Sequence, residues 1–151
     1  ILGNGSTRKE LYKLGDMLPY LKNHKGGYLG DKKVQIYGCN ALYREFEPDF
    51  LVVNNGTILQ EIVHKGYWYR HIVYTTHDGV LSYPGKFYLI PQDPSWNAGA
   101  VATYLACFDG HKTVYLAGFD GIDDHVTSII CSSTEQVRGV YTAVTGITTI
   151  V

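Results

Sequence analysis

The residues best suited to chemistry stand at the start of the chain, in the stretch Gly3, Asn4, Gly5 and Ser6. Two apolar residues run directly into this stretch, and 8–14 has the composition of a helix. Glycines let a backbone turn tightly and approach a ligand, while the first N–H groups of a helix favour an anion. We therefore predict a glycine turn that binds a phosphate or sugar phosphate. An ordinary strand-to-helix turn is the alternative, because the third glycine of a dinucleotide fingerprint is missing.

Asparagines follow the predicted strands that come next. Asn40 follows a β-rich segment, Asn54 and Asn55 follow a short apolar run, and Asn97 opens a predicted helix. Ligands of open parallel sheets bind beyond the carboxyl ends of the strands. An amide both donates and accepts hydrogen bonds, which suits the edge of a base or ribose hydroxyls, although asparagine is also common in turns and caps. The predicted nucleotide-binding residues are Gly3, Asn4, Gly5, Ser6, Asn40, Asn54, Asn55, Asn97 and Gly99.

Asp120 ends the clearest predicted strand, 113–117. It can cap a turn, bind ribose or a metal, or act as a general base. Together with Asp123, Asp124 and His125 it could hold a divalent ion, but a solvated acidic turn is the favoured interpretation, so no metal site is predicted. The other polar candidates are expected to be surface loop residues: His77, Asp78 and His111.

The order of the predicted elements indicates an α/β fold. Strands are predicted at 34–37, 50–53, 71–76, 87–90 and 113–117, helices at 8–17, 57–65 and 97–108, and a loop at 77–79. The last residues predict a helix over 134–144 and a strand over 147–151, with a hairpin as the alternative. This alternation favours a three-layer Rossmann-like sandwich around a mostly parallel sheet, in a single domain spanning 1–151.

Composition limits the classes of partner. The 151 residues carry 13 basic and 14 acidic side chains without a long block of one sign, so nucleic acid is not expected as a main partner. Three cysteines without CxxC spacing argue against disulfides and structural zinc and favour a reducing, cytoplasmic location. No apolar run is long enough to predict a membrane span. A homodimer that completes the site is compatible with the short chain.

Five dispersed segments together resemble a known family. They are Gly3-Asn4-Gly5-Ser6, Cys39-Asn40, Val53-Asn54-Asn55-Gly56, Asn97-Ala98-Gly99 and Val114–Asp120. In this order they resemble the bacterial sialyltransferases that use CMP-sialic acid, and they are similar, more loosely, to the archaeal 6-hydroxymethylpterin diphosphokinases. The resemblance implies that the segment Gly3 to Ser6 approaches the phosphate and nucleotide. It also implies that Asn40 and Asn54 contact ribose, phosphate or sugar, and that 97–99 lie near the nucleotide.

The resemblance implies a nucleotide or CMP-type nucleotide-sugar as the ligand and no certain cofactor. Few residues follow Asp120, so the lid that carries the family's catalytic histidine is expected to be missing, and the chain would be a reduced glycosyltransferase. His125 or Asp120 is then the candidate catalytic base. Two alternatives stay open: a pyrophosphokinase-like enzyme that uses Mg-ATP through Asp120 and its acidic neighbours, and a non-catalytic binding or assembly protein of the same fold.

Overall fold

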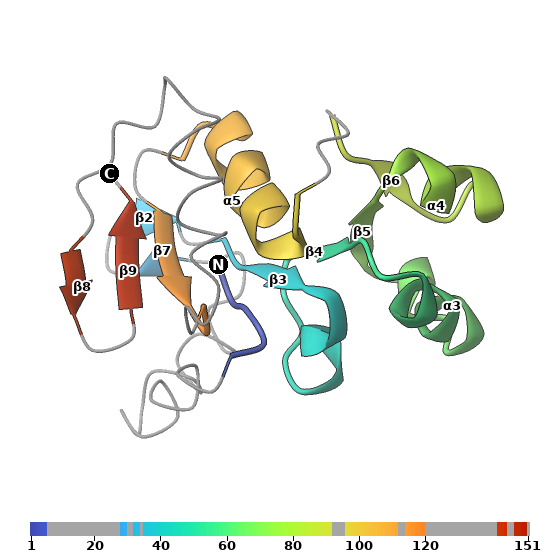
Figure 1. Ribbon diagram of the computed structural model, residues 1–151, viewed down its shortest axis with the longest axis horizontal. Coiled ribbons are helices and arrows are strands. Elements are labelled where there is room, and N and C mark those ends of the chain that lie inside the picture. The colour runs from blue at the N-terminus through green and yellow to red at the C-terminus, as the bar shows by residue number, and fades with distance from the viewer. Residues whose placement is uncertain are drawn as a thin grey trace.

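The computed structural model describes most of the chain between Gln35 and Phe119, and short segments nearer the ends. The described residues are 1–5, 28–29, 32–33, 35–91, 96–111, 114–119, 142–144 and 147–150. They form an α/β fold in which helices pack against a mostly parallel sheet (Figure 1).

Four parallel strands form the central part of the sheet, in the order β3-β4-β5-β6. Their bounds are Tyr37–Cys39, Phe50–Val53, Ile72–Thr75 and Tyr88–Leu89. The apolar run of β4 has the composition of a strand covered on both faces, and Leu51, Val52 and Val53 are all buried. This confirms the strand predicted at 50–53.

Leu2 connects these strands to the C-terminal part of the sheet. It makes parallel bridges with Gly38 of β3 and with Ala117 of β7. The bounds of β7, β8 and β9 are Val114–Ala117, Thr142–Val144 and Ile147–Ile150. β9 pairs antiparallel with both β7 and β8, so the order of the sheet is β8-β9-β7-Leu2-β3-β4-β5-β6. A separate antiparallel pair is formed by β1 (Tyr28–Leu29) and β2 (Lys32–Lys33).

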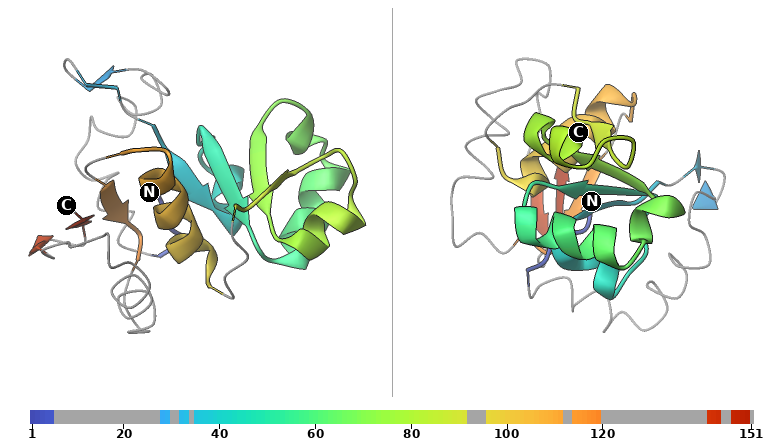
Figure 2. Two further views of the ribbon diagram at one scale, coloured as in Figure 1. Left: turned by 90° about the horizontal axis from the view of Figure 1, so that it is seen from above. Right: turned by 90° about the vertical axis from the view of Figure 1, so that its right-hand side faces the viewer.

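Helices lie on both faces of the parallel strands. On one face, α3 (Gly56–His64) and α4 (His77–Ser82) pack over a cluster that includes Leu51 and Val73. On the other face, α5 (Ala98–Phe108) packs over Val52 and other residues of β3 and β4. Figure 2 shows α3 and α4 at one end of the molecule, the C-terminal strands at the other end, and α5 between them. Two short 3-10 helices are η1 (Asn40–Arg44) and η2 (Tyr67–Tyr69).

The predicted strand at 34–37 was wrong in its position. Gln35 and Ile36 are not in a strand, because the Ile36 N–H donates to the Asp49 carboxylate at 2.7 Å and the Ile36 carbonyl accepts from Asp49 and Phe50. The two bonds to Asp49 anchor the loop before β4, and the bond to Phe50 reaches the first residue of β4. The strand therefore begins at Tyr37.

The predicted loop at 77–79 was also wrong, since these residues form the first turn of α4. Thr76 caps this turn by accepting a hydrogen bond from the Gly79 N–H at 3.4 Å. A side chain at Gly79 would meet the Thr75 hydroxyl oxygen at 2.5 Å, so the glycine serves close helix packing rather than a loop.

The structure favours the hairpin alternative near the C-terminus. The last three residues of the predicted helix 134–144 form β8, which pairs antiparallel with β9. The remainder of that predicted helix and the whole predicted helix 8–17 lie outside the described residues.

Candidate functional site

The order of the parallel strands reverses at Leu2, in the segment 1–5 that we call the N-terminal strand. Among the described strands of this sheet, β3 to β6 follow on one side of Leu2, and the chain then returns through α5 to form β7 on the other side. Ligands of open α/β sheets bind beyond the carboxyl ends of the strands at such a reversal. The residues that directly follow Leu2, β3, β4 and β7, together with the start of α5, are the candidate site, which we call the carboxyl edge.

Gly3 and Gly5 hold the N-terminal strand against the end of β7. Their N–H groups donate to the carbonyl oxygens of Ala117 and Gly118, both at 2.8 Å. A side chain at Gly3 would place its Cβ 2.5 Å from the Gly118 oxygen, so the two backbones can approach this closely only with glycine. The N–H groups of both glycines are therefore engaged within the sheet. Ser6, the next predicted site residue, lies outside the described residues.

Gly99 has a similar packing role in the first turn of α5. A Cβ on this residue would lie 2.2 Å from the Phe119 ring, which follows β7. The glycine thus lets the start of α5 lie directly against the chain that leaves the reversal point.

Asparagine side chains connect the ends of neighbouring segments at the carboxyl edge. Asn4 donates through Nδ2 to the Cys39 carbonyl at 2.8 Å, which links the N-terminal strand to β3. The Asn54 N–H donates to Asn40 Oδ1 at 3.2 Å, and Asn54 Nδ2 donates to the Trp96 carbonyl at 3.0 Å. The structure therefore brings these predicted residues together, as the sequence led us to expect.

Two further predicted asparagines cap helices. Asn97 Oδ1 accepts from the Ala100 N–H at 2.9 Å at the start of α5, and Asn55 Oδ1 accepts from the Ile58 N–H at 3.1 Å at the start of α3. The two caps are alike in geometry, but they belong to helices on opposite faces of the sheet. Asn55 follows Asn54 directly in the chain, whereas the Asn97 cap is linked to Asn54 across space, through the hydrogen bond to the neighbouring Trp96 carbonyl.

Three of these amides keep one hydrogen-bonding group without a protein partner. Within the described part of the chain, nothing pairs with Asn40 Nδ2, Asn54 Oδ1 or Asn97 Nδ2. The main-chain partners fix which end of each amide is the oxygen, because a carbonyl only accepts and an N–H only donates. The carboxyl edge thus offers two donors and one acceptor on a framework that is already held in place.

Asn40 is held in an unusual backbone conformation. Its φ is 46°, in the left-handed region, and it is the only non-glycine residue with positive φ in the described part of the chain. Such conformations cost free energy and are concentrated at functional sites, although asparagine tolerates them better than most residues. This conformation starts η1 immediately after β3 and puts the Asn40 side chain within reach of Asn54.

Cys39 lies at the carboxyl edge, but its thiol is buried. The side chain is 4% exposed, and burial raises the pKa of the thiol to about 12. At neutral pH the group is therefore a thiol rather than a thiolate, so it is neither an activated nucleophile nor a ready metal ligand. The contribution of this residue to the edge is its carbonyl.

The candidate catalytic residues Asp120 and His125 lie outside the described residues. Of the other polar candidates, His77 and Asp78 are exposed in the first turn of α4. His111 contacts Gln35 at 2.8 Å, beyond the C-terminal end of α5. In the described segments, no group of three or more His, Cys, Asp or Glu side chains could hold a metal ion.

Two residues of the edge were not identified from the sequence. Trp96 contributes its carbonyl to Asn54, and Phe119 contributes its ring against Gly99. A main-chain acceptor leaves no signal in residue type, so Trp96 was not predictable. Phe119 lies in the Val114–Asp120 segment that the sequence comparison used, but only the packing against α5 shows what the ring does.

No protein-family model, curated protein or solved structure matches this chain. Among the helices in the described residues, none combines the length and the apolar character needed to cross a bilayer.

Proposed function

We propose that the carboxyl edge binds the nucleotide part of a nucleotide or nucleotide-sugar, in a domain built as a three-layer Rossmann-like sandwich. The observation that carries this proposal is the set of amides on Asn40, Asn54 and Asn97. They are fixed by main-chain hydrogen bonds and keep unpaired groups where the strand order reverses. A prearranged set of donors and acceptors suits a base edge and ribose hydroxyls, since little ordering is needed on binding.

The start of α5 offers a favourable position for an anionic phosphate beside these amides. Asn97 satisfies the Ala100 N–H, whereas the preceding N–H groups of the first turn have no partner within a helix. Those donors and the helix dipole favour a negative charge. Gly99 contributes indirectly, because the absence of a side chain lets the start of α5 lie against Phe119 at the carboxyl edge. Gly3 and Gly5 contribute by bringing β7 close to the N-terminal strand.

A transfer reaction would need a base that removes a proton from the acceptor hydroxyl as the nucleotide phosphate departs. Asp120 and His125 are the residues that we propose for this step, because the resemblance to sialyltransferases and the end of β7 both direct attention there. The proposed enzyme is therefore a reduced glycosyltransferase that holds its nucleotide through amides.

Isothermal titration with CMP, CDP, UDP, ADP and ATP, each with and without Mg²⁺, tests the proposal. Binding of CMP without metal is the expected result. Binding of ATP that requires Mg²⁺ would replace the transferase with a phosphoryl-transfer enzyme. Absence of binding by all five nucleotides would leave a domain whose edge has no nucleotide function.

Asn97→Asp is the most informative variant for this titration. Aspartate keeps the oxygen that caps α5, but it removes the Nδ2 donor and places a negative charge beside the phosphate. We expect CMP affinity to fall about tenfold or more, which corresponds to about 1.4 kcal/mol, while thermal stability stays near the wild-type value. Thr76→Asp is the matched control, since it adds the same charge at the cap of α4. Equal losses in both variants would contradict a phosphate contact at α5.

A further inference from the structure

A row of aromatic rings runs across one face of the parallel strands. Starting from His111, the ring centroids are separated by 5.8 Å to Tyr37, 4.9 Å to Phe50, 6.4 Å to Tyr74 and 5.6 Å to Tyr88. The row crosses all four strands from β3 to β6. It lies on the α5 face of the sheet, where Tyr37, Phe50 and Tyr74 belong to the cluster that α5 covers.

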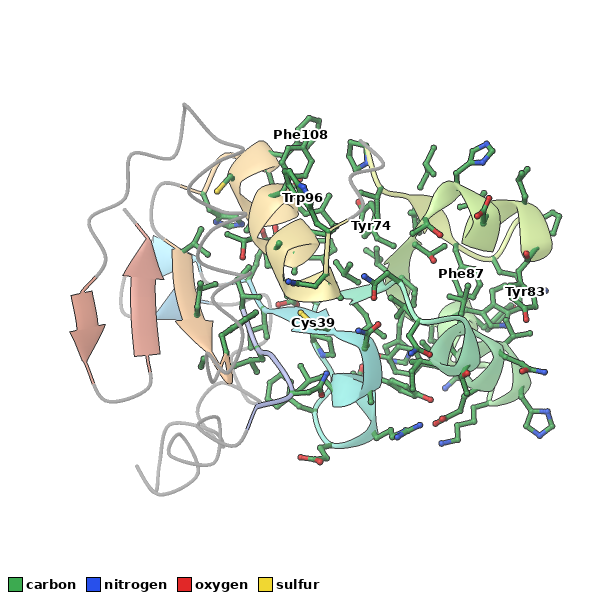
Figure 3. The ribbon with its side chains drawn as sticks, in the orientation of Figure 1. Cys39, Tyr74, Tyr83, Phe87, Trp96 and Phe108 are labelled. Carbon is green, nitrogen blue, oxygen red and sulfur yellow. The ribbon has the colours of Figure 1, made fainter. Side chains whose placement is uncertain are left out.

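A second row of rings follows α5. Trp96 and Tyr104 have ring centroids 6.1 Å apart, and Tyr104 and Phe108 have centroids 6.0 Å apart. Figure 3 shows Trp96 and Phe108 beside α5, with Tyr74 on the neighbouring part of the sheet. The last two rings of the first row and the whole second row form what we call the aromatic face: Tyr74, Tyr88, Trp96, Tyr104 and Phe108.

The aromatic face is the uncovered part of this side of the sheet. α5 contacts β3 and β4, while α3 and α4 pack on the opposite face. Among the described residues, no helix covers β5 and β6 on the α5 side. Tyr88 is 57% exposed, Phe108 64% and Ile72 38%. Large exposed aromatic side chains that adjoin one another indicate a binding surface.

The side chains of this face are amphipathic rather than simply apolar. Four of the five rings carry a hydroxyl or an indole N–H, which can hydrogen-bond at the rim of the ring. Of the exposed aliphatic residues of this half, Ile72 lies on the same side of the sheet as Tyr74, whereas Leu81 belongs to α4 and Leu89 to the other side of β6. A ligand with flat apolar patches and a polar rim therefore suits the aromatic face better than an aliphatic helix would.

Trp96 joins the aromatic face to the carboxyl edge. Its carbonyl accepts from Asn54 Nδ2, and its ring packs on Tyr104. At the far end of the face, the Asp109 carboxylate accepts from the Tyr37 hydroxyl at 2.6 Å. Burial raises the pKa of Tyr74, and the nearby Asp109 carboxylate raises it further. The rings thus lie between amides at one end and a carboxylate at the other, all groups that can bind hydroxyls.

We propose that the aromatic face binds the neutral sugar rings of a saccharide acceptor, a proposal that rests on the nucleotide-sugar function of the carboxyl edge. A pyranose has apolar C–H faces that stack on aromatic rings and a rim of hydroxyls that meets polar groups. The acceptor lies over β5 and β6 and reaches the carboxyl edge past Trp96.

Isothermal titration of the full chain with maltoheptaose, cellohexaose and chitohexaose tests the proposal. We expect at least one of them to bind. Tyr88→Ala and Phe108→Ala should each weaken that binding about tenfold, the loss of about 1.4 kcal/mol expected for one aromatic contact. Tyr69→Ala is the matched control, because Tyr69 is 77% exposed in η2 and belongs to neither row. Circular dichroism confirms that each variant is folded.

The other outcomes overturn the proposal. No binding of the three saccharides, or binding that the two substitutions leave unchanged, removes the glycan acceptor. A dimer that dissociates in Tyr88→Ala, without saccharide binding, assigns the face to a second copy of the chain. CMP titrations of the same variants separate this test from the proposed nucleotide site. If the proposed nucleotide site is wrong, the wild-type chain does not bind CMP. If only the saccharide proposal is wrong, the wild-type chain and Tyr88→Ala bind CMP with the same affinity.

Discussion

The sheet is packed differently around the N-terminal strand and β7 than around β4 and β5. Around the N-terminal strand and β7, backbones approach directly, because Gly3 lies against Gly118 and Gly99 lies against Phe119. Around β4, β5 and α3, apolar side chains such as Ile62 fill the space between the elements. The amides of Asn40, Asn54 and Asn97 lie at the carboxyl edge of the first half. The second half has a core filled by apolar side chains, and its polar residues Asn55 and Thr76 cap α3 and α4.

This difference indicates that binding and stability are largely separate in this fold. Asn40, Asn54 and Asn97 connect different segments at the reversal point while keeping unpaired groups. In the other half, the buried cluster of the described residues consists of apolar side chains such as Leu51, Ile62 and Val73. Substitutions in the two halves should therefore have different consequences, which gives three tests beyond the binding experiments.

The largest expected effect is on the side-chain-packed half. Ile62 is 0% exposed and lies in the cluster of Leu51, Val53 and Val73. Ile62→Ala should lower the free energy of unfolding by about 3 kcal/mol, because it removes buried methyl groups and leaves a cavity. Urea denaturation followed by circular dichroism measures the change. Ile58→Ala, at a half-buried position on the same helix, is the control and should cost less. Equal costs would show that this half is not organised around its buried side chains.

A smaller effect is expected where backbones approach one another. Gly3→Ala would bring a Cβ to 2.5 Å from the Gly118 oxygen, so the strands must separate. We expect the free energy of unfolding to fall by about 2 kcal/mol, as in other overpacked sites. Gly56→Ala is the matched control, because no atom lies within 4 Å of its Cβ and alanine suits the first turn of α3. Its stability should be unchanged or slightly higher.

A stable Gly3→Ala variant would contradict the close approach. The CMP titration then adds a second comparison within the same variant. Separation of the N-terminal strand from β7 displaces the carboxyl edge, so CMP affinity should fall in Gly3→Ala and stay unchanged in Gly56→Ala. Loss of stability without loss of affinity would limit the role of Gly3 to the fold.

The sequence was most informative where local patterns and long-range packing agree. The run Phe50–Val53, the helical spacing after Asn55 and the capped helix after Asn97 all predicted elements that the structure confirms. It failed at Gly79, because the pair Asp78-Gly79 has the composition of a turn while the packing against Thr75 requires glycine inside α4. Tertiary contact, not local preference, decided that segment.

The candidate site was predictable in its residue types but not in its connections. Asparagines at strand ends indicated a polar edge, and the Asn40 side chain does accept from the Asn54 backbone N–H there. The bridge from Asn54 to the Trp96 carbonyl depends on a main-chain atom, and the engagement of Gly3 and Gly5 with β7 depends on strand order. Neither leaves a pattern in the sequence, since both join segments far apart in the chain.

The smallest expected effect distinguishes two asparagines that look alike in the sequence. Asn55 caps α3 just as Asn97 caps α5, but α3 lies on the face opposite to α5. Asn55→Ala should lower the free energy of unfolding by about 1 kcal/mol, the usual cost of a lost cap, and leave CMP affinity unchanged. Asn55→Asp is the control that keeps the cap and should restore stability. Reduced CMP affinity in Asn55→Ala would extend the binding site to the α3 side of the sheet, and the division between a binding half and a packing half would then have to move beyond β4.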